Sequence, residues 1–164
     1  MNKFPNLKDP FHFVATLGGI GMLPKAPGTF GSIAAWVIFV YLSHFIGMTN
    51  MLILTTLLFI LSIWICNKAS EDLENKDHKS IVIDELVGMW IALLPVLIIA
   101  NSQYERTVYA LAALIFFRLF DILKPFPISY FDKNYKNGFG IVIDDAISGL
   151  LAVVPSCIIL ILLS

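Results

Sequence analysis

Three long stretches without a charged side chain constrain this fold more than any other feature of the sequence. Residues 26–67, 86–104 and 146–164 contain no Asp, Glu, Lys or Arg. The hydrocarbon core of a bilayer is about 30 Å thick, and a helix needs about 20 apolar residues to cross it. The first stretch is therefore long enough for two membrane-spanning helices, and each of the others fits one slightly short span.

The composition points to the same class of protein. Only 14% of the residues are charged, against roughly 25% in a soluble domain, and the mean hydropathy is +0.83. A soluble domain of 164 residues would need more polar groups than this to cover its surface. We therefore predict an all-α, polytopic helical membrane protein, a single domain over residues 1–164 with residues 1–17 as a candidate peripheral segment.

We expect four to five apolar helices. The candidates lie at residues 32–46, 50–67, 86–100, 107–123 and 146–163. The first and third are short for a full crossing, so they would tilt, thin the bilayer locally or span it incompletely.

The basic residues predict the orientation of these helices. Nine of the eleven Lys and Arg residues fall in segments on one side, Arg106 falls on the other side, and Arg118 lies within a helix. Loops rich in Lys and Arg remain in the cytoplasm. The nine residues that place the N-terminus there are Lys3, Lys8, Lys25, Lys68, Lys76, Lys79, Lys124, Lys133 and Lys136.

A short acidic motif occurs twice, as IVIDE at Ile81–Glu85 and as IVIDD at Ile141–Asp145. Both copies precede an apolar run and share an alanine and a proline at the same spacing, whereas Gly88 and Gly149 are offset by one position. Both would enter the membrane from the same side, so the repeat is parallel, unlike the inverted repeats of many transporters. Chance similarity between two apolar helices is the alternative.

If the two copies pack together, four carboxylates meet: Asp84, Glu85, Asp144 and Asp145. Carboxylates that are close together repel strongly at low dielectric and need a compensating cation. Oxygen ligands at a membrane edge suit Mg²⁺. The alternative is a favourable interaction with the helix dipole, worth ~0.3–1 kcal/mol, which explains one acid per helix better than two neighbours about 100° apart.

Two further motifs lie on the same predicted edge. In PKAPGTFGS, Gly28 and Gly31 permit close backbone approach, and Thr29 and Ser32 offer hydroxyls at a helix start. Such a turn is either an anion site or an ordinary helix cap.

The second motif, FRLFDILKPFP, spaces Arg118, Asp121 and Lys124 by three residues, which places them along one helix face. Arg and Lys are natural partners for phosphate oxygens, and the alternative is a cluster that snorkels to the interface. Together the motifs suggest metal-assisted chemistry on a lipid phosphate.

Four blocks of the chain, APGTFGS, DHKSIVIDELVG, FRLFDILKPFPI and GFGIVIDDAISG, resemble the signatures of the phosphatidylglycerophosphatase A family, in the same order over residues 18–160. The resemblance implies a Mg²⁺-dependent phosphatase of the bacterial inner membrane, with its active site facing the cytoplasm. Its substrate would be phosphatidylglycerophosphate and its product phosphatidylglycerol, and bilayer lipids would be its other partners. Lys79 stands where a small residue is more usual.

The resemblance and the residues together suggest roles. Asp84, Glu85, Asp144 and Asp145 would hold Mg²⁺, and Arg118 and Lys124 would bind the phosphate, with Asp121 as a ligand, a base or the residue that orients them. Gly28, Thr29, Gly31 and Ser32 would hold the phosphate or the glycerol. Attack by water is preferred to an aspartyl-phosphate. His78 is either a proton donor or a solvated loop residue.

Two other functions fit parts of the pattern. A CDP-alcohol phosphatidyltransferase also uses membrane-edge aspartates, but its long D-G-x-x-A-R motif is missing here. A small cation transporter would place its acids near the bilayer midplane rather than beside the apolar runs. The net charge of −1 suggests no nucleic-acid partner, and nothing in the sequence indicates the oligomeric state.

Overall fold

The computed structural model describes residues 4–73 and 76–163, so Lys3 of the topology argument lies outside the described residues. The predicted all-α class is confirmed, since no strand occurs in these two ranges. The elements are α1 (Pro10–Ala15), the 3₁₀ helix η1 (Ile20–Met22), α2 (Pro27–Ser43), α3 (Met48–Ala69), α4 (Ile83–Leu93), α5 (Val96–Ile99), α6 (Gln103–Leu123), α7 (Ile128–Asn134) and α8 (Gly138–Leu163).

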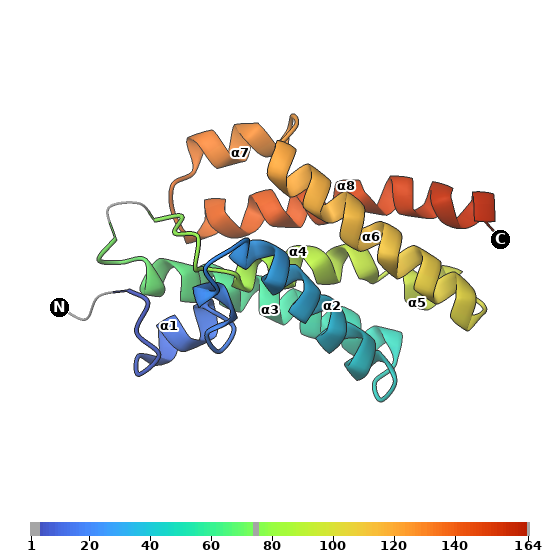
Figure 1. Cartoon of the computed structure of the whole chain (residues 1–164), viewed down its shortest axis with the longest axis horizontal. Helices are drawn as coiled ribbons and strands as arrows, with labels where there is room; N and C mark the ends of the chain where they lie inside the picture. The colour runs from blue at the N-terminus through green and yellow to red at the C-terminus, as the bar shows by residue number, and fades with distance from the viewer. Residues whose placement is uncertain (1–3, 74–75, 164) are drawn as a thin grey trace.

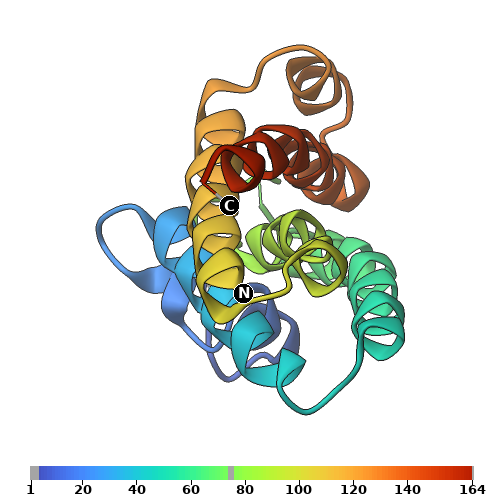
Figure 2. The same cartoon turned by 90° about the vertical axis from the view of Figure 1, so that its right-hand side faces the viewer.

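The longer helices form a bundle whose two ends differ. Helices α2, α4 and α8 run in one direction, and α3 and α6 run in the other (Figure 1). Helix α4 packs against all four of the others and lies between them when the bundle is seen from its end (Figure 2). The starts of α2, α4 and α8 and the end of α6 therefore share one end of the molecule, together with α1 and α7.

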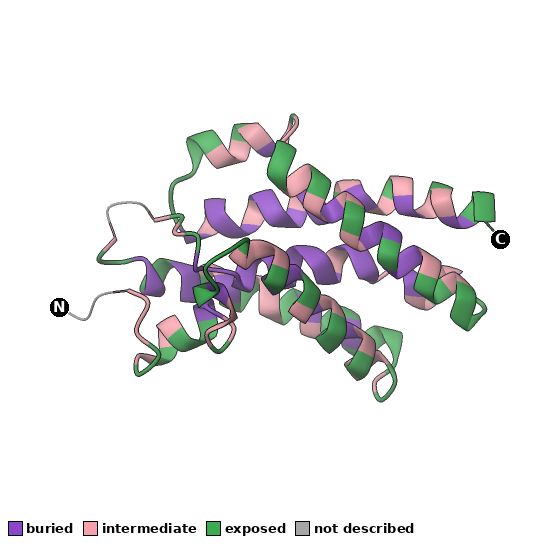
Figure 3. Cartoon of the chain, viewed as in Figure 1, coloured by how far each residue is buried: buried purple, intermediate pink, exposed green. Residues whose placement is uncertain are grey.

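Two helices, α3 and α8, are long and apolar enough to cross a membrane, and α2 is a shorter apolar helix. The outer surface of the bundle is apolar as well. Leu57 on α3 is 58% exposed, Ile115 on α6 is 64% exposed and Val154 on α8 is 61% exposed. The buried positions lie on the inner faces of the bundle and around the start of α4 (Figure 3). Exposed apolar side chains on several helices are typical of a surface that contacts lipid or another protein.

The acidic residues lie inside the helices and not in front of them. Helix α4 begins at Ile83 rather than at residue 86, and α8 begins at Gly138 rather than at residue 146. The side chain of Asn67 accepts a hydrogen bond from the Gly138 N–H at 2.7 Å, which caps α8 from the end of α3. The expected bounds were too late because they were drawn from the uncharged residues alone.

Two prolines at the same place in the repeat have different effects. Helix α4 ends at Leu93, and the chain turns at Pro95 before the short helix α5 begins. Pro155 instead lies inside α8, which continues to Leu163. A proline removes one backbone donor and crowds the preceding turn, which accounts for the interruption of the segment expected as a single helix at 86–100. Helix α8 tolerates the same loss and continues.

Helices α4 and α8 cross where two glycines meet. A Cβ atom added to Gly88 would lie 2.6 Å from the Asp145 carbonyl oxygen and from a ring carbon of Phe117. A Cβ atom on Gly149 would overlap the carbonyl oxygen of Gly88. The two glycines that were out of step in the repeat therefore allow backbone contact between the helices, as small residues do in membrane bundles. This contact brings Asp145 beside the first turn of α4.

We expect Gly88→Leu to destabilise the bundle by more than about 2 kcal/mol, because the new side chain has no space between the α4 and α8 backbones. The thermal midpoint of the purified protein in detergent measures this effect. Gly47→Ala is the matched control, since a Cβ atom at Gly47 meets nothing within 4 Å. Equal midpoints for the two variants would contradict the observed helix crossing.

Candidate metal and phosphate site

Three carboxylates from two helices meet at the shared end of the bundle. Asp84 and Glu85 lie in the first turn of α4, and Asp145 lies in α8. Each offers one oxygen, and these three oxygens lie within 4.8 Å of one another. The residues are only 8%, 9% and 3% exposed. In the sequence they are separated by up to 61 positions, and the glycine crossing brings them together.

Each carboxylate of the cluster has one oxygen without a hydrogen-bond partner in the part of the chain that the structure describes. Asp84 Oδ1, Glu85 Oε2 and Asp145 Oδ2 are buried and have no hydrogen-bond partner among the described residues. An ionised carboxylate without a partner is very unfavourable in such a place, and three together also repel. A divalent cation held by the three carboxylates would compensate their charge. The donor set is oxygen only, which suits Mg²⁺, Ca²⁺ or Mn²⁺ better than Zn²⁺, so these three residues fit the metal that the sequence predicted.

The fourth predicted acid faces elsewhere. Asp144 Oδ2 lies 2.6 Å from Lys124 Nζ, and Asp132 Oδ1 lies 2.7 Å from the same nitrogen. Neighbouring residues on a helix are separated by about 100°, so Asp144 and Asp145 point in different directions. The structure thus brings together three of the four acids and gives Asp144 a cationic partner instead.

Lys124 lies at the end of α6 in the left-handed conformation, with φ of 43°. Burial alone would lower the pKa of its ammonium, but the charge of Asp144 and the hydrogen bonds to Asp132 and Asp144 raise that pKa well above its ordinary value. Burial alone would likewise raise the pKa of the Asp132 carboxyl, but Lys124 and the nearby lysines lower it. Lys124 is therefore a fixed positive charge beside the acidic cluster.

Sequence reasoning missed Asp132. The residue lies on α7, a short helix that packs against α8. The only signal in the sequence was an aspartate a few residues after the prolines that end the preceding helix, and that signal is weak.

Arg118 connects three helices. Its Nη1 lies 2.6 Å from Asp121 Oδ2 and 3.7 Å from Glu85 Oε1. The same nitrogen lies 3.3 Å from Ser32 Oγ on α2. The Arg118 Nε atom is buried and has no hydrogen-bond partner in the described ranges. The guanidinium thus lies between the acidic cluster and the start of α2, and Asp121 holds it there.

Gly28 lies directly against this guanidinium. A Cβ atom at Gly28 would overlap Glu85 Oε1 and would lie 3.2 Å from both terminal nitrogens of Arg118. Helix α2 has Pro27 in its first turn and no side-chain cap. Its N-terminus therefore presents backbone, rather than a capping side chain, next to Arg118, which is an arrangement suited to an anion.

The other residues of the glycine motif have structural contacts. Ser32 Oγ donates to the Gly28 carbonyl at 2.8 Å. A Cβ atom at Gly31 would lie 2.9 Å from Cβ of Val82, just before α4. Thr29 is half-buried on the same turn, and its backbone N–H donates to the Ala26 carbonyl at 3.0 Å. These contacts fix the start of α2 against α4 and α6.

His78 lies apart from the cluster, in the connection between α3 and α4. Its Nδ1 accepts a hydrogen bond from the Ser80 N–H at 3.2 Å, and its ring meets Phe4 edge-on at 5.0 Å. Burial, followed by the charge of Lys79, lowers the pKa of the imidazole. These contacts hold the neutral ring in the connection.

Comparison with known proteins identifies relatives over nearly the whole chain. The family model described as phosphatidylglycerophosphatase A matches residues 13–160. A protein of Haemophilus influenzae with that name is 43% identical over 149 residues, which are 91% of this chain and 88% of the relative. The Escherichia coli protein of the same name is 34% identical over 146 residues, which are 89% and 81% of the two chains.

A third relative carries another name. A putative phosphatidylinositol-3-phosphatase of Bacteroides thetaiotaomicron is 36% identical over 141 residues, which are 84% of this chain and 85% of that protein. No solved structure matches the chain. Both names denote a phosphatase that acts on a phospholipid.

Proposed function

The chain belongs to the phosphatidylglycerophosphatase A family and is a phosphatase that hydrolyses phosphatidylglycerophosphate, and we propose that it does so at the cluster of Asp84, Glu85 and Asp145. One observation carries this assignment. Three buried carboxylates, each with one oxygen that lacks a hydrogen-bond partner within residues 4–73 and 76–163, meet beside a guanidinium at a helix start. A cation site next to an anion site is what a phosphate monoester requires.

Mg²⁺ is the proposed cofactor, held by Asp84, Glu85 and Asp145. When bound, a divalent cation polarises a phosphate oxygen and makes water a better nucleophile. Asp144 was expected as a fourth ligand, and this remains a prediction. Its contact with Lys124 supports a second role, in which Asp144 fixes the ammonium beside the phosphate.

Arg118 and Lys124 are proposed to bind the non-bridging oxygens of the phosphate. Both are held by carboxylates before substrate arrives, Arg118 by Asp121 and Lys124 by Asp132 and Asp144. Donors that are fixed in advance stabilise the charge of the transition state without reorganisation. The backbone around Gly28 and the side chain of Thr29 would bind a further phosphate oxygen or the glycerol. Attack by water is proposed rather than by an aspartate.

We also propose that α2, α4 and α6 lie in the bilayer with α3 and α8, and that the site faces the cytoplasm at the inner membrane. The exposed apolar side chains on α2 and α6, such as Val37 at 52% and Ile122 at 67%, support this arrangement. The lysines gathered at the end of the bundle that holds the site support the orientation.

The proposed orientation predicts which introduced cysteines react from each side. In a chain with Cys66 and Cys157 replaced by Ala, Asn134→Cys on α7 should react only after the inner membrane is permeabilised. Asn101→Cys, between α5 and α6, should react with an impermeant maleimide applied from the periplasm. The reverse labelling pattern would contradict the proposed orientation. It would not bear on the assignment of the enzymatic activity.

The reaction is tested with purified protein and three lipids. Phosphatidylglycerophosphate should give phosphatidylglycerol and inorganic phosphate, whereas CDP-diacylglycerol with glycerol phosphate should release no CMP. Phosphatidylinositol 3-phosphate tests the activity named for the third relative, and we expect a lower kcat/KM for it. CMP release would favour the phosphatidyltransferase, and absence of any turnover would contradict the assignment.

A further inference from the structure

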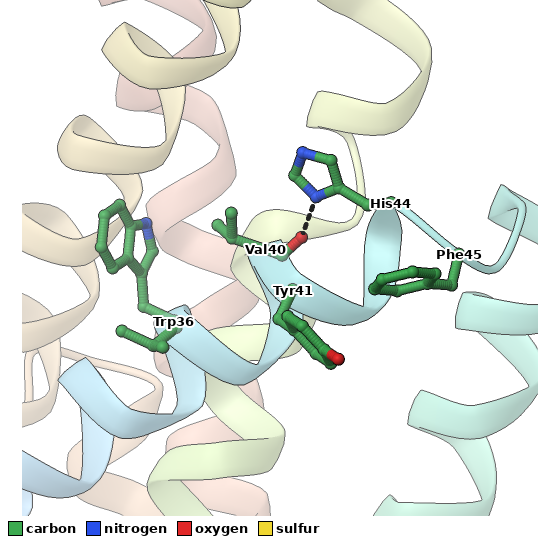
Figure 4. Close-up of a pocket in the computed structure, with 6 residues that line it drawn as sticks. Trp36, Val40, Tyr41, His44 and Phe45 are labelled. Atoms are coloured by element: carbon green, nitrogen blue, oxygen red, sulfur yellow. Dashed lines mark hydrogen bonds between the residues drawn. The ribbon is translucent and has the colours of Figure 1, made fainter.

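A groove and a cavity adjoin each other at the far end of the bundle. The groove, of about 470 Å³, runs over the second half of α2 and is lined by Trp36, Val37, Val40, Tyr41, His44 and Phe45 (Figure 4). His44 Nδ1 donates to the Val40 carbonyl at 2.7 Å, which holds the imidazole at the end of the groove (Figure 4).

The cavity, of about 150 Å³, lies between α2, α4, α5 and α6 and shares Trp36, Val40 and His44 with the groove. It adds a polar wall of Ser43, Gln103, Arg106 and Thr107. The groove is apolar, and the adjoining cavity combines apolar side chains with this polar wall. A molecule with an apolar tail and a polar head would match this arrangement. The volume of the groove lies within the range of about 300–1,000 Å³ that ligand pockets occupy.

This place is remote from the phosphatase site. Arg106 lies in the first turn of α6, whereas Arg118 lies toward the opposite end of that helix (Figure 1). Tyr41, Phe45 and Tyr104 are 64%, 70% and 61% exposed around it. Tyrosines gather where a membrane meets water, so the bilayer arrangement proposed above would place the pocket at the level of the headgroups of the opposite leaflet.

Arg106 gives the pocket a positive charge. Its neighbour Glu105 is engaged at the start of α6, where its carboxylate accepts the Asn101 N–H at 2.7 Å. No ion pair joins Arg106 to any residue in the described part of the chain. The cation is therefore free to pair with an external anion.

Trp36 has an indole N–H without a hydrogen-bond acceptor in the described structure. Its Nε1 atom is buried and has no hydrogen-bond partner among residues 4–73 and 76–163. A buried indole N–H without an acceptor is unusual. The residue lines both the groove and the cavity, so a small rotation of its side chain when a ligand binds would present this hydrogen to a ligand oxygen.

We propose that the groove and the cavity together bind one anionic phospholipid of the opposite leaflet. The phosphate pairs with Arg106 among the polar side chains, an ester oxygen accepts from Trp36, and an acyl chain lies along Val37, Tyr41 and Phe45. The charge of Arg106 selects an anionic headgroup over a zwitterionic one. This site is separate from the one at which the substrate is hydrolysed.

The test uses the fluorescence of Trp36. In a Trp64→Phe background, the exposed Trp64 is removed, while Trp90, which is only 2% exposed, remains shielded. The protein is placed in phosphatidylcholine bilayers that contain increasing amounts of brominated phosphatidylglycerol or brominated phosphatidylcholine. We expect half-maximal quenching at a several-fold lower fraction of the anionic lipid. Trp36→Phe should remove this quenching.

Variants at the two ends of the bundle test whether Arg106 causes the preference for the anionic lipid. Arg106→Gln should abolish the preference for the anionic lipid, and Arg106→Lys should keep most of it. Lys8→Gln removes an exposed charge at the opposite end of the bundle, near α1, and should leave the preference unchanged. Equal quenching by both lipids, quenching that survives Trp36→Phe, or an unchanged preference in Arg106→Gln would each overturn the proposal.

Discussion

Asp145→Asn and Asp84→Asn are each expected to lower phosphate release from phosphatidylglycerophosphate by more than about 100-fold, since even changes outside the first coordination shell cost about 10- to 100-fold. Each substitution replaces one of three carboxylates whose oxygens lie within 4.8 Å of one another. The amide has nearly the same shape but no charge, so the loss would come from cation binding rather than from packing. The rate at saturating lipid measures it.

A stability measurement separates this cause from misfolding. Without metal, either amide removes repulsion within the cluster, so the thermal midpoint should stay the same or rise. Mg²⁺ should raise the midpoint of the unmodified protein, because a ligand that binds only the folded state stabilises it, and it should have little effect on the variants. Asp72→Asn, at an exposed position, is the control. Full activity in either cluster variant would contradict the metal site.

Arg118→Lys is expected to lower kcat/KM by about 100-fold or more, in the range seen when one fixed donor to a transition-state charge is removed. The planar guanidinium contacts Asp121, Glu85 and Ser32 at once. A lysine ammonium is a point charge and cannot reproduce that geometry. Steady-state kinetics on phosphatidylglycerophosphate measure the effect, and we expect most of it in kcat.

Asp121→Asn should lower kcat/KM less than Arg118→Lys does. The amide keeps a hydrogen bond to Arg118 but loses the charge that holds it at 2.6 Å, so the decrease should be smaller than for Arg118→Lys. Lys68→Gln, at an exposed cation that pairs with Glu71 on the surface, should behave like the unmodified protein. If Arg118→Lys matched Lys68→Gln, Arg118 would have no part in phosphate binding.

The repeated motif predicted the neighbourhood of the acids but not their directions. Two parallel copies were expected to bring acid pairs together, and Asp84, Glu85 and Asp145 do meet. The orientation of Asp144 depends on Lys124 and on α7, which lie in a different part of the sequence. Such long-range pairing leaves no periodic signal, and Asp132 was missed for the same reason.

The glycines show a similar limit. In the repeat they are offset by one position, whereas in the structure Gly88 and Gly149 allow α4 and α8 to touch. Contact between two helices depends on their crossing angle, which an alignment of the copies does not contain. The class of the fold, in contrast, followed from uncharged stretches alone, because a bilayer accepts little besides helices there.

Phosphate release from phosphatidylglycerophosphate as a function of free Mg²⁺, measured for the unmodified protein and Asp145→Asn side by side, tests the metal site most directly. We expect no release in excess chelator, saturable recovery as Mg²⁺ is added back to the unmodified protein, and no recovery in the variant over the same range. Full release in excess chelator, or identical Mg²⁺ curves for the two proteins, would contradict a metal site built from Asp84, Glu85 and Asp145.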